Sequence, residues 1–197
     1  MAPHGAPIAP IITARETVMT EACQIRLAGT GGQGLGLAGR LLADALVAQG
    51  MQVAQSQTYE PTSRGGASRS DLVAAHGPVD YPLVTRLDYL VLLDQSALED
   101  AGELLDDKAL VIIDADRVNA PPTGGFAIHA LHPTAAAREL GNPRVANVIS
   151  LGALVSLSSI CDFATLEAVV ASSTPAKFRE LNIAALREGR RIADTLG

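Results

Sequence analysis

The stretch that decides the fold runs from Gln24 to Arg40 and reads QIRLAGTGGQGLGLAGR. Its first five residues alternate polar and apolar side chains, which is the pattern of a strand. Glycines then crowd the chain, and Leu35, Ala38 and Leu42 follow at helical spacing. A strand, a tight glycine turn and a helix therefore come in succession, which is typical of the first unit of an α/β domain.

The same glycines match the pattern G-x-G-x-x-G at Gly29, Gly31 and Gly34, the fingerprint of a dinucleotide-binding turn. Such a site also expects a carboxylate near the end of the second strand, which binds the ribose. The second strand expected here, MQVAQSQ over 51–57, has no acid, and Glu60 lies beyond it. The fingerprint is incomplete. Three interpretations stay open: an NAD or FAD site, a purely structural turn, and a site for another phosphate-bearing ligand or a subunit interface.

The rest of the chain continues the α/β pattern. Two runs, at 88–94 and 109–116, are almost entirely apolar. They predict strands covered on both faces, as in a parallel sheet. We expect a Rossmann-like, three-layer α/β domain with a mostly parallel sheet and a helical C-terminal segment. The expected elements are a βαβ unit over 24–56, strands at 70–75, 88–94, 109–116 and 125–131, a crossover helix at 95–107, and helices from residue 133 onward with breaks near 141, 161 and 175.

A second loop, TYEPTSRGGASRS over 58–70, is rich in glycine and carries two arginines. An arginine beside two glycines can bind a phosphate or carboxylate through paired N–H groups, with backbone N–H groups assisting. The candidate binding residues in this loop are Arg64, Gly65, Gly66 and Ser68. The alternative is an exposed loop whose glycines only turn the chain.

Composition excludes several classes of function. The net charge is −6 with only two lysines, which argues against binding of nucleic acid or of a membrane surface. Cys23 and Cys161 are the only cysteines and form no C-x-x-C motif, so the chain lacks the ligands of an iron–sulfur cluster or a structural zinc. We expect free thiols in a reducing, cytoplasmic compartment. No apolar run is long enough to span a membrane, and no set of catalytic side chains stands out.

Five segments together resemble a known family. GTGGQGLGLAGRLLADALVAQGMQV is followed by TYEPTSRGGASRSDLVA and then by VDYPLVTRLDYLVLLDQSAL; NPRVANVISLGAL and KFRELNIAALREG come later. This order is similar to that in the gamma subunit, or gamma domain, of the 2-oxoacid:ferredoxin oxidoreductases, which act on pyruvate, 2-oxoglutarate, 2-oxoisovalerate or indolepyruvate. The resemblance covers residues 23–193.

The resemblance implies a multi-subunit enzyme that oxidatively decarboxylates a 2-oxoacid, with 2-oxoglutarate or pyruvate expected, to acyl-coenzyme A. It also implies thiamine diphosphate, Mg²⁺ and iron–sulfur clusters in alpha, beta and ferredoxin-like delta partner subunits only, and ferredoxin as the electron acceptor. This chain would assist coenzyme A binding and active-site closure. A free-standing NAD or FAD dehydrogenase and a purely structural interface subunit are the alternatives.

The family's motifs can be transferred residue by residue. The glycine loop corresponds to Gly29, Gly31, Gly32, Gln33 and Gly34, and the second loop to Tyr59, Arg64, Gly65 and Gly66, with Asn147 and Gly152 in the later helical segment. Glu60 departs from the family, which has a small residue after the tyrosine. We expect residues 23–197 to form one gamma-type domain, and residues 1–22 to be either a disordered leader or an arm that contacts a partner subunit.

Overall fold

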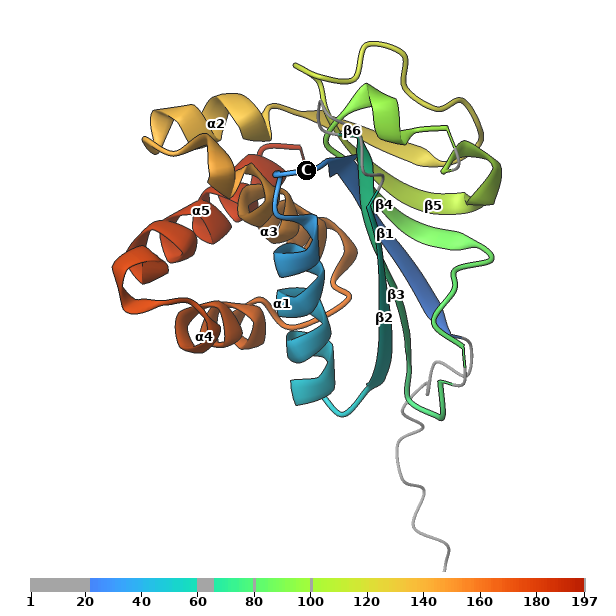
Figure 1. Cartoon of the computed structure of the whole chain (residues 1–197), viewed down its shortest axis with the longest axis horizontal. Helices are drawn as coiled ribbons and strands as arrows, with labels where there is room; N and C mark the ends of the chain where they lie inside the picture. Colours follow the sequence, from blue (N-terminus) through green and yellow to red (C-terminus); the bar gives the residue numbers. More distant parts are fainter. Residues whose placement is uncertain (1–21, 60–65, 80, 100, 197) are drawn as a thin grey trace, which may run out of the picture.

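The computed structural model describes residues 22–59, 66–79, 81–99 and 101–196. They form one six-stranded sheet in the order β2-β3-β1-β4-β5-β6, flanked by helices (Figure 1). The pairs β1–β4, β4–β5 and β5–β6 are parallel, whereas β3 runs antiparallel to both β1 and β2. The strands are β1 (Cys23–Thr30), β2 (Gln52–Tyr59), β3 (Ala67–Ala75), β4 (Leu87–Leu92), β5 (Leu105–Asp114) and β6 (Ala127–Leu131).

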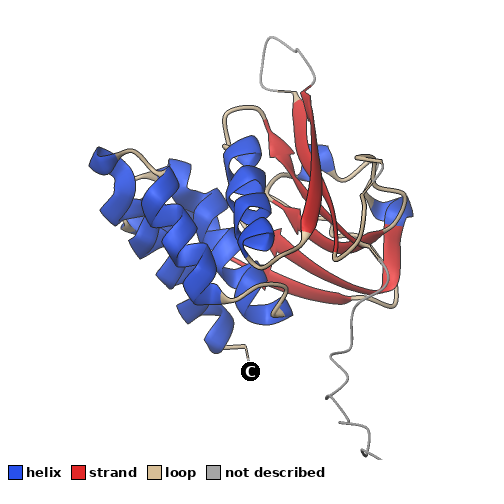
Figure 2. Ribbon diagram, turned by 90° about the horizontal axis from the view of Figure 1, so that it is seen from below, coloured by secondary structure: helices blue, strands red, loops and turns tan. Residues whose placement is uncertain are grey.

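The α-helices gather on one face of the sheet (Figure 2). They are α1 (Leu35–Ala48), α2 (Pro133–Glu139), α3 (Ala146–Ser158), α4 (Phe163–Ser173) and α5 (Ala176–Asp194). The larger core lies between these helices and the sheet, around Ile25, Leu42 and Ile149. A smaller core on the opposite face packs β4 and β5 against loops and 3₁₀ turns, around Leu90 and Val111. The three-layer α/β fold expected from the sequence is confirmed, including its helical C-terminal segment.

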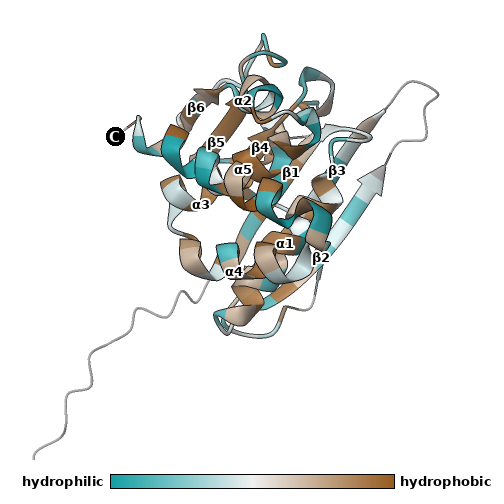
Figure 3. Ribbon diagram, turned by 90° about the vertical axis from the view of Figure 1, so that its left-hand side faces the viewer, coloured by the Kyte–Doolittle hydropathy of each residue, from teal (hydrophilic) through white to brown (hydrophobic). Residues whose placement is uncertain are grey.

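The central strands are the most apolar part of the sheet, and β4 and β5 appear brown in Figure 3. Their apolar runs were the sequence signal for strands covered on both faces, and both faces of these strands are covered. The outer strand β2 is more hydrophilic, since it lies at the edge of the sheet and pairs only with β3.

Two sequence predictions need correction. The βαβ unit over 24–56 forms, but β3 lies between its two strands, so β1 and β2 are not neighbours. The crossover helix expected over 95–107 is wrong: this segment holds two short 3₁₀ turns, η1 (Gln95–Ala97) and η2 (Gly102–Leu104), and β5 already begins at Leu105. Gly102 disfavours a continuous helix, and Leu105 pairs with Leu87 of β4, which leaves too few residues for one.

Helices α3 and α5 pack backbone to backbone. A Cβ atom placed on Gly189 would overlap the carbonyl oxygen of Ile149, and one on Gly152 would overlap that of Leu186. Only glycine lets the two helices approach this closely. Gly152, which the family resemblance singled out, therefore has a packing role rather than a ligand role in this structure.

Candidate functional site

The two glycine-containing loops meet at the carboxyl end of β1. The backbone N–H of Gly31 donates a hydrogen bond to the carbonyl oxygen of Gly66, at 3.0 Å. Ser68 of β3 lies opposite Gly29 of β1 on one side and opposite Tyr59 of β2 on the other. Sequence segments about 35 residues apart thus meet in the fold.

The turn between β1 and α1 requires glycine at two positions. Gly32 has φ +90° and Gly34 has φ +72°, both in the region that side chains with a Cβ rarely adopt. Gly34 is also the residue before α1, and its left-handed conformation turns the chain into the helix. No side chain caps the start of α1. The first N–H groups of this helix therefore lack both an intrahelical acceptor and a side-chain cap, and they favour an anion.

Gln33 holds the turn from inside. Its Oε1 accepts a hydrogen bond from the Thr30 N–H at 2.6 Å, and its Nε2 donates one to the Leu93 carbonyl at 3.1 Å. The amide also lies against Gly29, where a Cβ would overlap Oε1. Both ends of this side chain are thus engaged within the chain. The geometry favours a positioning role for Gln33, which joins the glycine turn to the end of β4.

Asn147 supports the other end of the turn. Its Nδ2 donates to the carbonyl oxygen of Gly34 at 2.8 Å, and its Oδ1 accepts from the N–H of Val148. A Cβ on Gly34 would come within 2.6 Å of Nδ2. Asn147 is buried at the start of α3, so the C-terminal helices and the glycine turn are mechanically coupled.

Part of the predicted site is not described by the structure. Arg64 and Gly65 lie outside the described residues, and of Tyr59 only the backbone, at the end of β2, is described. Gly66 directly precedes β3, and Ser68 is buried within it. The glycine turn, Gly66 and Ser68 are thus brought together, while the roles given to the arginine and the tyrosine stay predictions.

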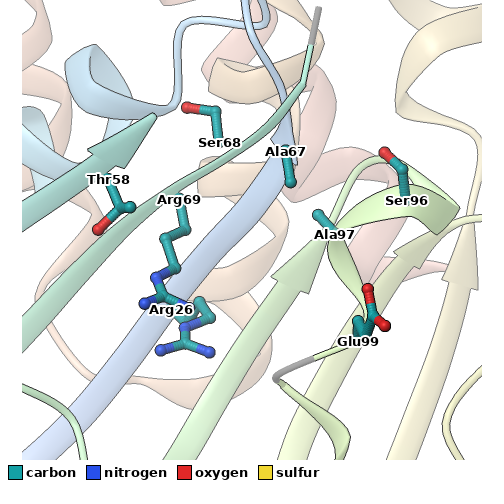
Figure 4. Close-up of a pocket in the computed structure, with 8 residues that line it drawn as sticks. All are labelled: Arg26, Thr58, Ala67, Ser68, Arg69, Ser96, Ala97 and Glu99. Atoms are coloured by element: carbon teal, nitrogen blue, oxygen red, sulfur yellow. The ribbon is translucent and has the colours of Figure 1, made fainter. Parts of the chain in front are cut away.

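A small cavity of about 140 Å³ opens beside Ser68, on the sheet face opposite α1 (Figure 4). Ligand-binding clefts typically enclose at least roughly 300 Å³. This cavity can therefore accept a small anion or one end of a longer ligand, but not a whole nucleotide cofactor. Its lining residues are Arg26, Thr58, Ala67, Ser68, Arg69, Ser96, Ala97 and Glu99.

Arg26, one of the lining residues, belongs to a buried ion pair. Nε and Nη2 of Arg26 donate to the two carboxylate oxygens of Asp71 at 2.7 and 2.8 Å, and both side chains are about 5% exposed. Nε of Arg69 lies 3.9 Å from the same carboxylate. Two guanidinium groups thus surround one carboxylate, with Glu99 on the facing segment. The sequence analysis missed this group. The available signal was a pair of opposite charges in two predicted strands: Arg26 in QIRLA and Asp71 in SDLVAA.

Two acidic residues, Asp94 and Asp114, lie at the ends of the central strands, and each has an internal partner. Asp94 accepts from the N–H and hydroxyl of Ser96 and from Nε and Nη2 of Arg117. Burial acts to raise the pKa of Asp94, but these hydrogen bonds outweigh it, and the net pKa is lowered. Asp114 is fully buried, which raises its pKa despite a hydrogen bond from the Thr134 hydroxyl. These contacts favour capping and loop anchoring over catalysis.

The topology argues against a classical dinucleotide site. In a Rossmann domain the second strand lies directly beside the first, which places its terminal carboxylate near the ribose. Here β3 lies between β1 and β2. The end of β2 is therefore displaced by one further strand spacing, about 4.8 Å, and it carries no carboxylate between Gln52 and Tyr59.

The chain does not fit an iron–sulfur cluster of its own. Such clusters need four ligands, usually cysteine thiolates, and the sequence holds two cysteines. Both are buried and free. Burial raises the pKa of Cys23 to about 12, helped by the nearby Asp88, and that of Cys161 to about 11. Among the described residues no cluster of three or more His, Cys, Asp or Glu could hold a metal, and no helix is long and apolar enough to cross a membrane.

Comparison with known proteins agrees with the motif order. Residues 24–192 match the family described as pyruvate ferredoxin/flavodoxin oxidoreductase. The chain is 40% identical over 139 residues to the 2-oxoglutarate synthase subunit KorC of Archaeoglobus fulgidus, covering 71% of this chain and 72% of the relative. It is 34% identical over 177 residues to KorC of Methanocaldococcus jannaschii, covering 88% and 95%.

Solved structures show the same fold. The gamma subunit of a keto/oxoacid ferredoxin oxidoreductase from Geobacter sulfurreducens has a TM-score of 0.80 and 36% identity, over 89% of this chain and 98% of that one. A 2-oxoglutarate:ferredoxin oxidoreductase from Magnetococcus marinus, with 2-oxoglutarate, coenzyme A and succinyl-CoA bound, has a TM-score of 0.78 at 22% identity. The match covers 89% of this chain but only 32% of that longer protein.

Proposed function

Because the chain belongs to the pyruvate ferredoxin/flavodoxin oxidoreductase family and is a subunit of a 2-oxoacid:ferredoxin oxidoreductase, we propose that its complex converts 2-oxoglutarate to succinyl-coenzyme A and CO₂ and reduces ferredoxin. We further propose that this chain helps to bind coenzyme A and carries neither thiamine diphosphate nor a cluster. The choice of 2-oxoglutarate is supported by the KorC relatives, which bear the name 2-oxoglutarate synthase.

The single observation that carries the coenzyme A proposal is the hydrogen bond from Gly31 to Gly66. It joins the uncapped start of α1 to the chain that continues from Arg64 and Gly65. A helix start and an arginine both favour a phosphate group, and coenzyme A carries three. The cavity at Arg26 and Arg69 does not add to this argument, because both guanidinium groups lie against Asp71 and Glu99 also lines the cavity. Because Gln33 and Asn147 bond within the chain, we assign them the role of holding the turn in shape.

The division of labour follows from chemistry. Decarboxylation of a 2-oxoacid needs the electron sink that thiamine diphosphate supplies, and one-electron transfer to ferredoxin needs clusters. The two buried thiols here cannot ligate a cluster. We therefore place these groups on the alpha, beta and ferredoxin-like delta partners, within the reducing cytoplasm. In this proposal the present chain binds coenzyme A, which accepts the acyl group, and shields the reacting centre from water.

The test is to purify the complex gently from its own cells by way of this chain. We expect larger subunits carrying iron, sulfide and thiamine diphosphate, and coenzyme A-dependent dye reduction with 2-oxoglutarate well above that with pyruvate or 2-oxoisovalerate. Preference for another 2-oxoacid would overturn the substrate assignment alone. Iron or thiamine diphosphate on the separated chain would overturn the proposed division of labour.

A purely structural role is the second candidate, and one observation favours it: the side chains of Gln33 and Asn147 are already satisfied inside the chain. This reading predicts that variants of both loops leave the coenzyme A dependence of the complex unchanged. The NAD or FAD dehydrogenase is disfavoured by the position of β3.

A further inference from the structure

Among the described residues, β2 is an edge strand that no other strand covers on its outer side. β2 spans eight residues, QVAQSQTY, and pairs with β3 in an unbroken register from Gln52 to Tyr59. It contains no charge, no proline and no bulge, the devices that usually keep edge strands from pairing with another strand. The opposite edge strand, β6, has only five residues. Figure 3 shows β2 at the rim of the molecule.

Helix α1 runs beside this edge and presents a self-complementary stripe. Leu37 and Val47 are exposed by 50% and 54%, and between them lie Arg40 and Asp44, whose side chains are 77% and 47% exposed. Leu37 and Arg40 line a hollow together with Gln55 and Gln57 of β2, so this side of the helix faces the edge. The order along the stripe is apolar, positive, negative, apolar.

A two-fold axis would match this stripe with itself. The midpoint of Leu37 and Val47 and the midpoint of Arg40 and Asp44 both fall at residue 42, since each pair is placed symmetrically about it. In an antiparallel α1–α1 pair, Leu37 therefore meets Val47 of the second copy. Arg40 meets Asp44 of the second copy, and the same contacts recur on the other side of the axis. An isologous interface has this reciprocity.

The spacing of the layers also fits. A second β2 strand would lie about 4.8 Å from the first, so the axis would lie about 2.4 Å beyond β2. α1 packs across β2 and β3, where Gly36 contacts Gln57 and Gly39 contacts Gln55 and Ser70. A helix centred between these strands lies about 4.8 Å from the axis, which puts the two α1 helices about 10 Å apart. Packed helices lie roughly 8–10 Å apart.

We infer that two copies of this chain join through β2 and α1, which forms a continuous twelve-stranded sheet with a central α1–α1 pair. The occupant is a second copy because the charges and apolar ends match under a two-fold axis. An unrelated strand would satisfy the edge but would leave the α1 stripe without its complement. This inference is independent of the bound substrate, so it stands or fails separately from the proposed function.

The test uses the full-length chain in sedimentation equilibrium. We expect a dimer, and we expect Arg40→Glu or Asp44→Arg alone to raise its dissociation constant about tenfold, because each change places like charges together on both sides of the axis. The double variant Arg40→Glu with Asp44→Arg restores the wild-type constant. Lys177→Glu, an exposed charge reversal on α5, leaves it unchanged. Thermal melts of all variants check that the fold is retained.

Cross-linking checks the register. Chains with Arg40→Cys are mixed in equal amounts with chains with Asp44→Cys and treated with a short bismaleimide. Mixed pairs should then exceed either like pair by clearly more than the factor of two that random mixing alone gives. The native thiols stay silent because Cys23 and Cys161 are buried with raised pKa values. A monomer at all concentrations, a dimer insensitive to both single charge changes, or cross-links in the intact complex that reach another kind of subunit would each overturn the inference.

Discussion

Two regions of this molecule use glycine for opposite reasons. In the turn before α1, Gly32 and Gly34 supply positive φ angles, and polar side chains then hold the turn. Where α3 crosses α5, Gly152 and Gly189 have ordinary backbone angles and supply closeness, because any Cβ would overlap the facing backbone. The first region is polar and accessible, and the second is apolar and buried. Glycines of the first kind shape the surface that we propose to bind coenzyme A, and glycines of the second kind fix the scaffold behind it.

The largest expected effect lies next to the polar region, at the buried Arg26–Asp71 pair that joins β1 to β3. Asp71→Ala leaves the Arg26 guanidinium buried without its carboxylate, and we expect a loss of about 4 kcal/mol in the free energy of unfolding. Denaturant unfolding of the chain measures it. The double variant Arg26→Met with Asp71→Leu should recover most of the loss; equal destabilisation of both variants would contradict a charge-based cause.

In the apolar half, Gly189→Ala pushes α5 away from the Ile149 carbonyl. Overpacking of this kind costs about 1–3 kcal/mol or somewhat more, and we expect the upper part of that range because the obstacle is backbone. Gly102→Ala is the matched control, since a Cβ there meets nothing within 4 Å and its φ is not positive. Similar unfolding midpoints for the two variants would show that the helices can separate freely.

A third change compares two glutamines with the same bonding pattern. Gln33 bridges Thr30 and Leu93 at a partly buried turn, whereas Gln95 makes two equivalent bonds to Ala120 in an exposed loop. We expect Gln33→Ala to cost about 2 kcal/mol and Gln95→Ala well under half of that, because water replaces bonds only where it can enter. The Gln33 variant should also raise the KM for coenzyme A. Equal stability losses would remove the turn-holding role.

The smallest effect is pH-dependent. Asp94 has a lowered pKa in the folded chain, so its stabilisation is complete above the usual Asp pKa and is lost as the pH falls through the lowered value. Arg117→Met should therefore cost about 1 kcal/mol at neutral pH, a modest amount because Arg117 is partly exposed. The difference from wild type should vanish in acid. A constant difference at every pH would assign the effect to packing.

Local sequence patterns predicted most of the helices and strands, but they did not predict which strands pair. The sequence predicted the first strand–turn–helix unit and the strands β4 and β5, because each of these segments has its own pattern of apolar residues. The sequence did not predict the position of β3 between β1 and β2, because the sequence of a strand does not determine which strand lies beside it. The error at 95–107 arose because a crossover helix was expected between two parallel strands, whereas Gly102 and the early start of β5 leave no room for one.

The candidate site could be predicted from the sequence to a similar extent. The glycine loop and the second loop were found as motifs, and the structure joins them through Gly31 and Gly66. The positioning roles of Gln33 and Asn147 depend on partners 60 and 113 residues away, at Leu93 and Gly34. Spacing within a motif does not reveal such partners. The Arg26–Asp71 pair was visible only as two isolated charges in strands.

The central claim is that this chain contacts coenzyme A through its second loop, and the most direct measurement is the KM for coenzyme A of the intact complex carrying Arg64→Ala. We predict an increase of about tenfold, the loss of one charged phosphate contact, with the KM for 2-oxoglutarate unchanged. Arg179→Ala, an exposed arginine on α5, is the control. A KM for coenzyme A equal to that of the wild type would contradict the claim and leave the loop a structural or subunit contact.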